Sequence, residues 1–208
     1  TDLVGRRVVY PTNPLGDLLP DDGTALHEGD RGWLTKVPVI EWQRLREGDP
    51  THYPVDLPFT ASDGPWRMIH GVPAGYSRTP QGAALAAIWA ANFLVFPHDG
   101  AVNMLHAYGS IEQQKILDDF TPNEEQKEAA AAYDGTSVFL IPRAYRIMHY
   151  DGNHALVQLA TGRRNTMKVV EMSLTWDDTQ KTWHGSSNEF FADAGKVTTS
   201  ELGEWVRL

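Results

Sequence analysis

The sequence predicts an α+β domain in which helices pack on one face of a curved antiparallel sheet. Three observations lead to this prediction. Ten of the 13 prolines lie in residues 1–80, which disfavours long helices and central strands there. Apolar residues then recur at helical spacing behind Thr79-Pro80, and the apolar period changes to two after Gly135.

Residues 1–70 are expected to form an extended, loop-rich arm that packs on the rest of the chain. The arm is rich in proline and glycine, yet it carries too many large apolar side chains for a solvated linker. A disordered first 25 residues or so is the alternative. The predicted division is an arm at 1–70, an α+β body at 71–185 and a C-terminal tail at 186–208.

The helices are predicted from their N-terminal signals. Thr79 is a good N-cap and Pro80 suits the first helical position, so a mostly buried helix is expected at 80–96. A second helix is expected at 110–120. Thr121-Pro122-Asn123-Glu124 reads as a capping box, which predicts a third helix ending near Tyr133.

The strands follow from alternation and turn residues. Asp151-Gly152 predicts a hairpin between strands at 143–150 and 153–160, because both residues tolerate positive φ. A longer strand is expected at 167–176, then a turn at 177–180 and a strand at 181–185. The tail is expected to be polar, with a short helix or strand at 201–208 that docks Trp205.

Length and charge narrow the class of protein. The 208 residues suit one domain of ordinary size, or a compact domain with an irregular arm. The formal net charge is −9, with 8 basic and 12 acidic residues in 1–109 and 10 and 15 in 110–208. Nucleic-acid-binding proteins usually carry a basic surface. Both halves here are acidic, so we expect no nucleic-acid partner.

The absence of cysteine excludes disulfides, zinc–thiolate sites, iron–sulfur clusters and thiol catalysis. It fits a cytosolic protein and equally an exported bacterial domain that is stable without disulfides. The longest apolar stretch, residues 83–96, is too short to span a bilayer about 30 Å thick. We therefore expect any membrane anchor to lie outside this sequence.

Two segments resemble a known family. The run Gly75-Tyr76-Ser77-Arg78-Thr79-Pro80-Gln81-Gly82-Ala83 resembles a block found in actinobacterial proteins of integrative conjugative elements and plasmids. Those proteins are typically membrane-anchored with an extracytoplasmic domain. The run Leu174-Thr175-Trp176-Asp177-Asp178, followed by Trp183, is similar to the end of an NTF2-like domain, as in VirB8/TcpC-type subunits of conjugative type IV secretion systems.

The resemblance implies a non-enzymatic assembly domain with an NTF2-like cone, located outside the cytoplasm. Its expected partners are cell-envelope proteins of a transfer complex, and self-association into a homo-oligomer is a further expectation. No cofactor or metal is expected. The candidate interaction residues are Arg78, Trp33, Trp42 and Trp66, because exposed tryptophan and arginine are enriched in interface hot spots. Ion pairing of Arg78 and core packing of the tryptophans are the structural alternatives.

Three alternatives stay open. A small NTF2-like enzyme or ligand-binding protein would use an acid–base pair inside the cone, with His149, Tyr145 and Asp134 as candidates. His149 is expected to share a strand face with Tyr145. A secreted or surface binding protein is the second alternative. The third is a metal site, from His98-Asp99 and His106 in a loop or from the acidic residues at 21–30, although a solvated acidic loop is favoured.

Overall fold

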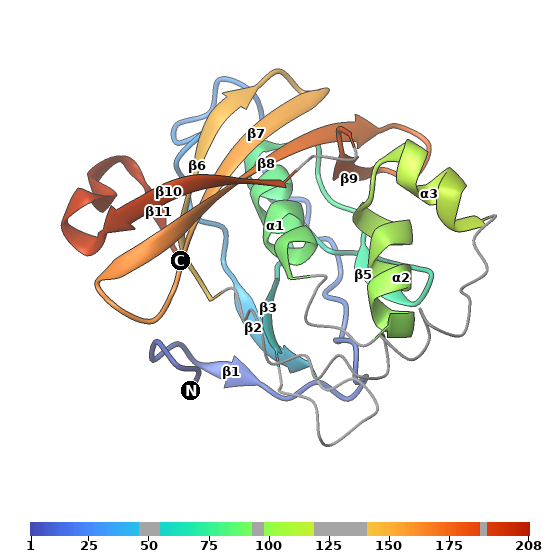
Figure 1. The fold of residues 1–208 in the computed structure, drawn as a ribbon, viewed down its shortest axis with the longest axis horizontal. Coiled ribbons are helices and arrows are strands. Elements are labelled where there is room, and N and C mark those ends of the chain that lie inside the picture. The colour runs from blue at the N-terminus through green and yellow to red at the C-terminus, as the bar shows by residue number, and fades with distance from the viewer. Residues whose placement is uncertain (46–54, 93–97, 119–140, 188–190) are drawn as a thin grey trace.

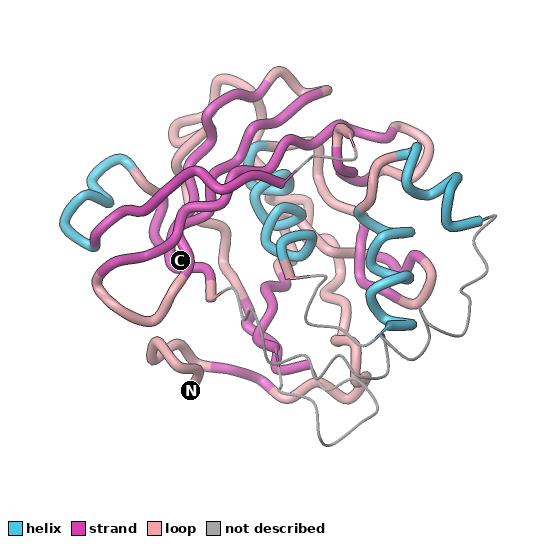
Figure 2. Tube along the Cα trace, viewed as in Figure 1, coloured by secondary structure: helices cyan, strands magenta, loops and turns pink. Residues whose placement is uncertain are grey.

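The computed structural model describes residues 1–45, 55–92, 98–118, 141–187 and 191–208, and it has an α+β architecture. Among these residues, a six-stranded sheet, a three-stranded sheet and a two-stranded sheet surround a central helix. Figure 1 shows the central helix α1 with the large sheet on one side and β2 and β3 on the other. Figure 2 shows how much of the first 40 residues runs as loop.

The large sheet contains the predicted meander. Its strand order is β10-β8-β7-β6-β11, with β9 paired to the second half of β8, and all of its pairs are antiparallel. The strands are β6 (Pro142–Tyr150), β7 (His154–Thr161), β8 (Thr166–Asp177), β9 (Thr182–Gly185), β10 (Phe191–Thr198) and β11 (Val206–Arg207). The hairpin at Asp151-Gly152 is confirmed: Gly152 has a φ of +86°, and the Asp151 carboxylate accepts the N–H groups of Asn153 and His154.

Alternation divides the large sheet into two apolar faces. Leu159 and Val170 point toward α1 and belong to the main hydrophobic cluster. Their chain neighbours Ala160 and Val169 point to the opposite face and form a second cluster with Trp205. The period of two that predicts these strands therefore also assigns their side chains to separate layers.

Helix α1 (Pro80–Ala91) is buried along its whole length. The predicted start is confirmed, because Thr79 accepts a hydrogen bond from the Gly82 N–H and Pro80 opens the helix. The helix ends at Ala91, where Asn92 turns its side-chain amide back to the Ile88 carbonyl over 2.8 Å. Residues 93–96 of the expected helix lie outside the described part of the chain. A helix that is apolar all round needs partners on both sides.

The second partner of α1 comes from the proline-rich region. Strands β2 (Glu41–Leu45) and β3 (Val55–Phe59) pair antiparallel, and β1 (Val8–Val9) pairs parallel to β2. Leu57 and Phe59 join the main hydrophobic cluster around α1. The expectation that central strands are unlikely in this region is therefore wrong for β2, which lies between β1 and β3. Pro58 fits because β3 is an edge strand, where a missing N–H leaves no ladder bond unmade.

A helical pair covers the far side of β9. Helices α2 (His98–Tyr108) and α3 (Ile111–Asp118) pack on each other, and α2 also contacts β5 (Val72–Ala74) and β9. Strand β4 (Arg67–Ile69) pairs with β5. The second predicted helix is thus confirmed as α3, whereas the expectation of a loop at His98-Asp99 and His106 is wrong. The third predicted helix lies outside the described residues.

Both ends of the chain are held at the start of β6. Arg6 donates to the carbonyl of Pro142 over 2.8 Å, and the N–H of Leu208 donates to the carbonyl of Arg143 over 3.0 Å. The C-terminal segment contains β10, a 3-10 helix (Thr199–Glu204) and β11. The docking of Trp205 is confirmed, because it is buried in the second cluster beneath the Arg146 guanidinium, 4.7 Å from its ring. Strand β10 was not expected from the polar sequence of the tail.

Candidate functional site

The segment from Gly75 to Gly82 folds around a buried carboxylate. Asp63 accepts hydrogen bonds from three hydroxyl groups: its Oδ1 from Ser77 over 2.5 Å and from Thr79 over 2.6 Å, and its Oδ2 from Ser62 over 2.6 Å. Asp63 is only 3% exposed. It lies at the N-terminal end of α1, because it accepts a hydrogen bond from Thr79, the N-cap of that helix. A negative charge is favourable at this end of a helix. This network fixes the turn that enters the helix.

Gly82 is required by the same turn. A Cβ atom at this position would lie 2.3 Å from the Ser77 carbonyl oxygen, which is backbone and cannot move aside easily. The glycine therefore lets the first turn of α1 approach the preceding loop. Most of the block that resembles the conjugative-element family has such a structural role.

Arg78 is the exposed side chain of this block. Its Nε donates to the Gly152 carbonyl over 2.7 Å, and its Nη2 donates to the Asn153 side chain. Its guanidinium also lies 5.9 Å from the Trp176 ring and 3.8 Å from a carboxylate oxygen of Asp178. With 41% of the side chain exposed, the guanidinium bridges two turns of the large sheet and still faces solvent.

Trp33 lies beside Arg78. Its ring contacts the Tyr150 ring edge-on, with 5.6 Å between centroids, and the Tyr150 hydroxyl donates to the Arg78 carbonyl over 2.6 Å. Burial raises the pKa of Tyr150 to about 12, so its hydroxyl stays a donor at neutral pH. A hollow of about 300 Å³ opens here. We call this region the Arg78 surface, and its members are Trp33, Arg78, Tyr150, Asp151 and Trp176.

The other two candidate tryptophans lie elsewhere. Trp42 is buried in β2, and the Arg6 guanidinium covers its ring at 3.6 Å from the centroid. Trp66 is half-buried before β4, where its backbone N–H bonds to the carbonyls of Ala74 and Gly75. Trp42 is therefore a packing residue, and the structure brings only Arg78 and Trp33 of the four candidates together.

His149 does not face the interior. The expectation that it shares a face with Tyr145 is wrong, because a β-bulge between Ile147 and His149 shifts the register of β6 against β7. One extra residue reverses the alternation. Tyr150 consequently points to the core, and His149 is 60% exposed, with its Nε2 3.5 Å from Asp151. Tyr145 is buried and donates to the Lys36 carbonyl, and Asp134 lies outside the described residues.

A buried histidine on β9 was missed. His184 has 3% of its side chain exposed, its Nδ1 lies 3.1 Å from the Gln114 amide of α3, and its Nε2 lies 3.7 Å from Asp177. Burial lowers the pKa of His184 below its ordinary value. Neither of the two pockets described here is lined by this pair. The alternation of β9 predicts that Trp183 lies in the core. It does not reveal that α2 and α3 cover the opposite face of the strand, where His184 lies.

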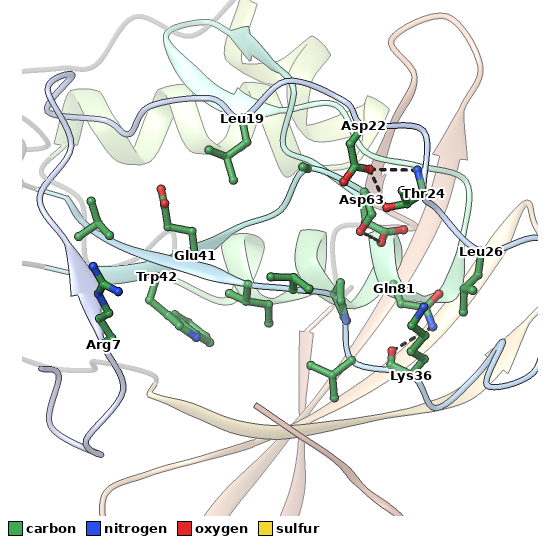
Figure 3. A pocket seen from close by; sticks show the side chains of 17 residues that line it. Arg7, Leu19, Asp22, Thr24, Leu26, Lys36, Glu41, Trp42, Asp63 and Gln81 are labelled. Carbon is green, nitrogen blue, oxygen red and sulfur yellow. Dashed lines mark hydrogen bonds between the residues drawn. The ribbon is translucent and has the colours of Figure 1, made fainter.

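A larger pocket lies between the segment at 19–26 and residues 36–42. Its volume is about 590 Å³, within the roughly 300–1,000 Å³ typical of ligand sites. Figure 3 shows Arg7 and Trp42 at one end and Asp63, Gln81 and Lys36 at the other. No sequence pattern predicts this pocket, because most of its walls come from irregular segments far apart in the chain.

The acidic residues at 21–30 organise local turns. Asp21 accepts the N–H of Gly23, Asp22 accepts the N–H and hydroxyl of Thr24, and Asp30 accepts the N–H of His27. Within the described residues, no group of three or more histidine and acidic side chains is arranged to hold a metal ion. Likewise, no helix in the described ranges is long and apolar enough to cross a membrane.

The fold and site define an α+β domain with a central helix enclosed by sheets and an aromatic, arginine-containing surface at the sheet turns. Residues 9–207 match the family described as Domain of unknown function (DUF8175), and the chain belongs to this family. A comparison with curated proteins found no match, and a comparison with solved structures found none either.

Proposed function

We propose that this chain is a non-enzymatic assembly domain of a conjugative, type IV secretion-like apparatus. In this proposal it has an NTF2-like cone and lies outside the cytoplasm, anchored to the membrane by a segment beyond this sequence. Its partners are cell-envelope proteins of the transfer complex, and the Arg78 surface is the contact site. The resemblance of the Gly75–Ala83 block to conjugative-element proteins supplies the biological setting.

The filled interior is the observation that supports an assembly role. Trp89 and Trp183 are completely buried, Trp89 between α1 and β3 and Trp183 on β9 of the large sheet, and Ile147 and Trp176 pack against the same cluster. An NTF2-like enzyme needs an open cone with an acid–base pair inside it. The candidate base His149 lies on the outer surface instead, which favours binding over catalysis.

The Arg78 surface has the composition of a contact site. Two tryptophans, a tyrosine and an arginine gather there from segments distant in the sequence, and these residue types dominate interface hot spots. Arg78 itself contributes little to the core because it is exposed. The solvent-facing part of its guanidinium is available to a partner, while the same group bridges two turns of the large sheet.

The NTF2-like cone is also part of the proposal. The order of helices before an antiparallel meander supports it, as do the bulges in β6 and the packing of α1 across one face of the large sheet. β-Bulges bend strands and increase their twist, which is how a sheet acquires a concave face.

Conjugation efficiency in a host that carries the element tests the role of Arg78. We expect Arg78→Gln to lower transfer by about tenfold or more, because losing an arginine hot spot costs about 2 kcal/mol of binding. Arg163→Gln is the matched control, because Arg163 is exposed in the turn between β7 and β8 and loses the same charge. Urea melts of both purified variants should stay close to wild type. Equal transfer by wild type and Arg78→Gln would contradict the proposed contact site.

A further inference from the structure

The pocket of Figure 3 contains an acceptor without a donor. Gln81 is 2% exposed, and its Nε2 donates to the carbonyls of Trp33 over 3.0 Å and Lys36 over 3.2 Å. These two bonds use both amide hydrogens and fix the orientation of the group. Its Oε1 is buried and has no hydrogen-bond partner within the described chain. A buried acceptor left without a donor is costly, so a ligand that supplies a donor would be stabilised here.

A buried carboxylate lines the same pocket. Asp63 receives three hydroxyl hydrogens but forms no ion pair with any described residue. Its Oδ2 accepts from Ser62 and retains capacity for a further donor. Hydroxyl groups and a helix N-terminus stabilise this charge without neutralising it. The end of the pocket that contains Asp63 and Gln81 is therefore rich in acceptors.

Apolar side chains form the walls beyond this acceptor-rich end. Leu19, Leu26, Val37, Pro38 and Ile40 all line the pocket. Val39, which follows Pro38, is 92% exposed, and Val37 is 40% exposed. A ligand that fits must therefore combine a donor-rich head with an apolar chain.

We propose that this pocket binds a primary alkylammonium group. An ammonium carries three hydrogens and one positive charge, which suits an acceptor-only oxygen from Gln81 beside the carboxylate of Asp63. Its alkyl chain contacts the apolar walls. A small amine and the side chain of a lysine residue share this chemistry.

The cationic residues of the pocket are compatible with this ligand. Arg7 lies at the opposite end in Figure 3, and Lys36 lies at the acceptor-rich end. Neither Lys36 nor Asp63 makes an ion pair with a described residue, so Lys36 does not neutralise Asp63. Replacing Lys36 with glutamine keeps its backbone carbonyl, which Gln81 uses, and removes a competing charge.

Titration of the ¹⁵N-labelled chain with pentylammonium chloride, followed by NMR, tests the proposal. We expect saturable shifts of the Gln81 side-chain amide and of the backbone N–H of Val37 and Val39, with a Kd on the order of 1 mM. 1-Pentanol has nearly the same shape without the charge and should bind about tenfold more weakly. Equal shifts with 1-pentanol would show that the pocket is merely apolar and would overturn the proposal.

Charge-neutral variants locate the ammonium group. Asp63→Asn should weaken pentylammonium binding about tenfold, and Asp22→Asn, at the pocket rim, about threefold. Asp21→Asn is the matched control because Asp21 neighbours Asp22 but does not line the pocket. Lys36→Gln should strengthen binding. Asp22→Asn and Lys36→Gln carry the test if Asp63→Asn does not fold, and unchanged affinity in both would overturn the proposal.

A second titration distinguishes the two sources of the ammonium. Nα-acetyl-lysine N-methylamide presents an ammonium group on a four-methylene chain, as pentylammonium does, but attached to a peptide backbone. Tighter binding of this compound than of pentylammonium assigns the pocket to a lysine side chain of a partner. Tighter binding of pentylammonium assigns it to a small amine. Failure of both to bind would refute the site, whatever the outcome of the conjugation experiment with Arg78.

Discussion

The indole N–H of Trp89 donates to the backbone carbonyl of Pro58 over 3.0 Å, across 31 positions of sequence. The Phe59 ring meets the same indole edge-on, with 5.5 Å between ring centroids. Trp89 therefore joins α1 to β3 by a hydrogen bond and an aromatic contact. The central helix and the proline-rich region depend on each other through this side chain.

Trp89→Ala should lower the free energy of unfolding by about 3–5 kcal/mol, because it leaves a cavity between α1 and β3. Urea or guanidinium melts would measure this loss. Ile111→Ala serves as the control, since Ile111 is 57% exposed and its truncation should cost less than about 1 kcal/mol. A loss below roughly 1 kcal/mol for Trp89→Ala would mean that the helix face is not enclosed as described.

Backbone amides of β2 and β3 should exchange slowly with deuterium. Their ladder bonds and the packing of Leu57 and Phe59 on α1 make opening of this sheet expensive. Residues 27–31, which lie in exposed turns, provide the fast-exchanging reference. Complete exchange of β2 and β3 within seconds would indicate a tether that does not pack stably on α1.

Gly82→Ala should destabilise the protein by about 1–3 kcal/mol, because the new Cβ would overlap the Ser77 carbonyl. Thermal or urea denaturation measures the effect. Gly203→Ala is the matched control, since a Cβ there meets nothing within 4 Å. Equal stability of the two variants would show that the turn before α1 relaxes without cost.

Stability should fall as the pH is lowered below about 6.5, the ordinary pKa of histidine. Burial lowers the pKa of His184 in the folded state, so the unfolded chain binds more protons in this range. The urea midpoint should therefore be lower at pH 5.5 than at pH 8. His184→Gln should reduce this difference, whereas His27→Gln, at a position 86% exposed, should not. An unchanged pH dependence in His184→Gln would contradict the inference.

The elements that could be predicted from the sequence are those determined by residues close together in the chain. The N-cap at Thr79 and the turn at Asp151-Gly152 are set by neighbouring residues, so the start of α1 and the β6–β7 hairpin could be found from the sequence. Strand β3 was missed because Pro58 argues against a strand, and only its edge position and its contact with Trp89 make it tolerable. Strand β10 was missed because residues 192–196 are exposed and small or charged, so no apolar alternation marks the strand.

The site was predictable only in part for a similar reason. Arg78 could be singled out, because it is the residue of its block that the turn does not need. The approach of Trp33 to Tyr150 depends on the path of an irregular segment, which no periodicity describes. The outward position of His149 depends on a single extra residue in β6, and nothing in the alternation announces that bulge.

Segments near both chain ends bond to adjacent residues of β6. The Arg6 side chain donates to the carbonyl of Pro142, and the N–H of Leu208 donates to the carbonyl of Arg143. A short flexible linker could therefore close the chain into a ring without disturbing α1 or the large sheet. New ends could then be opened in the exposed turn at 163–165, between β7 and β8. Such a circular permutant would make β8 the first strand to be synthesised, and its refolding would reveal whether the order of assembly depends on the order of the chain.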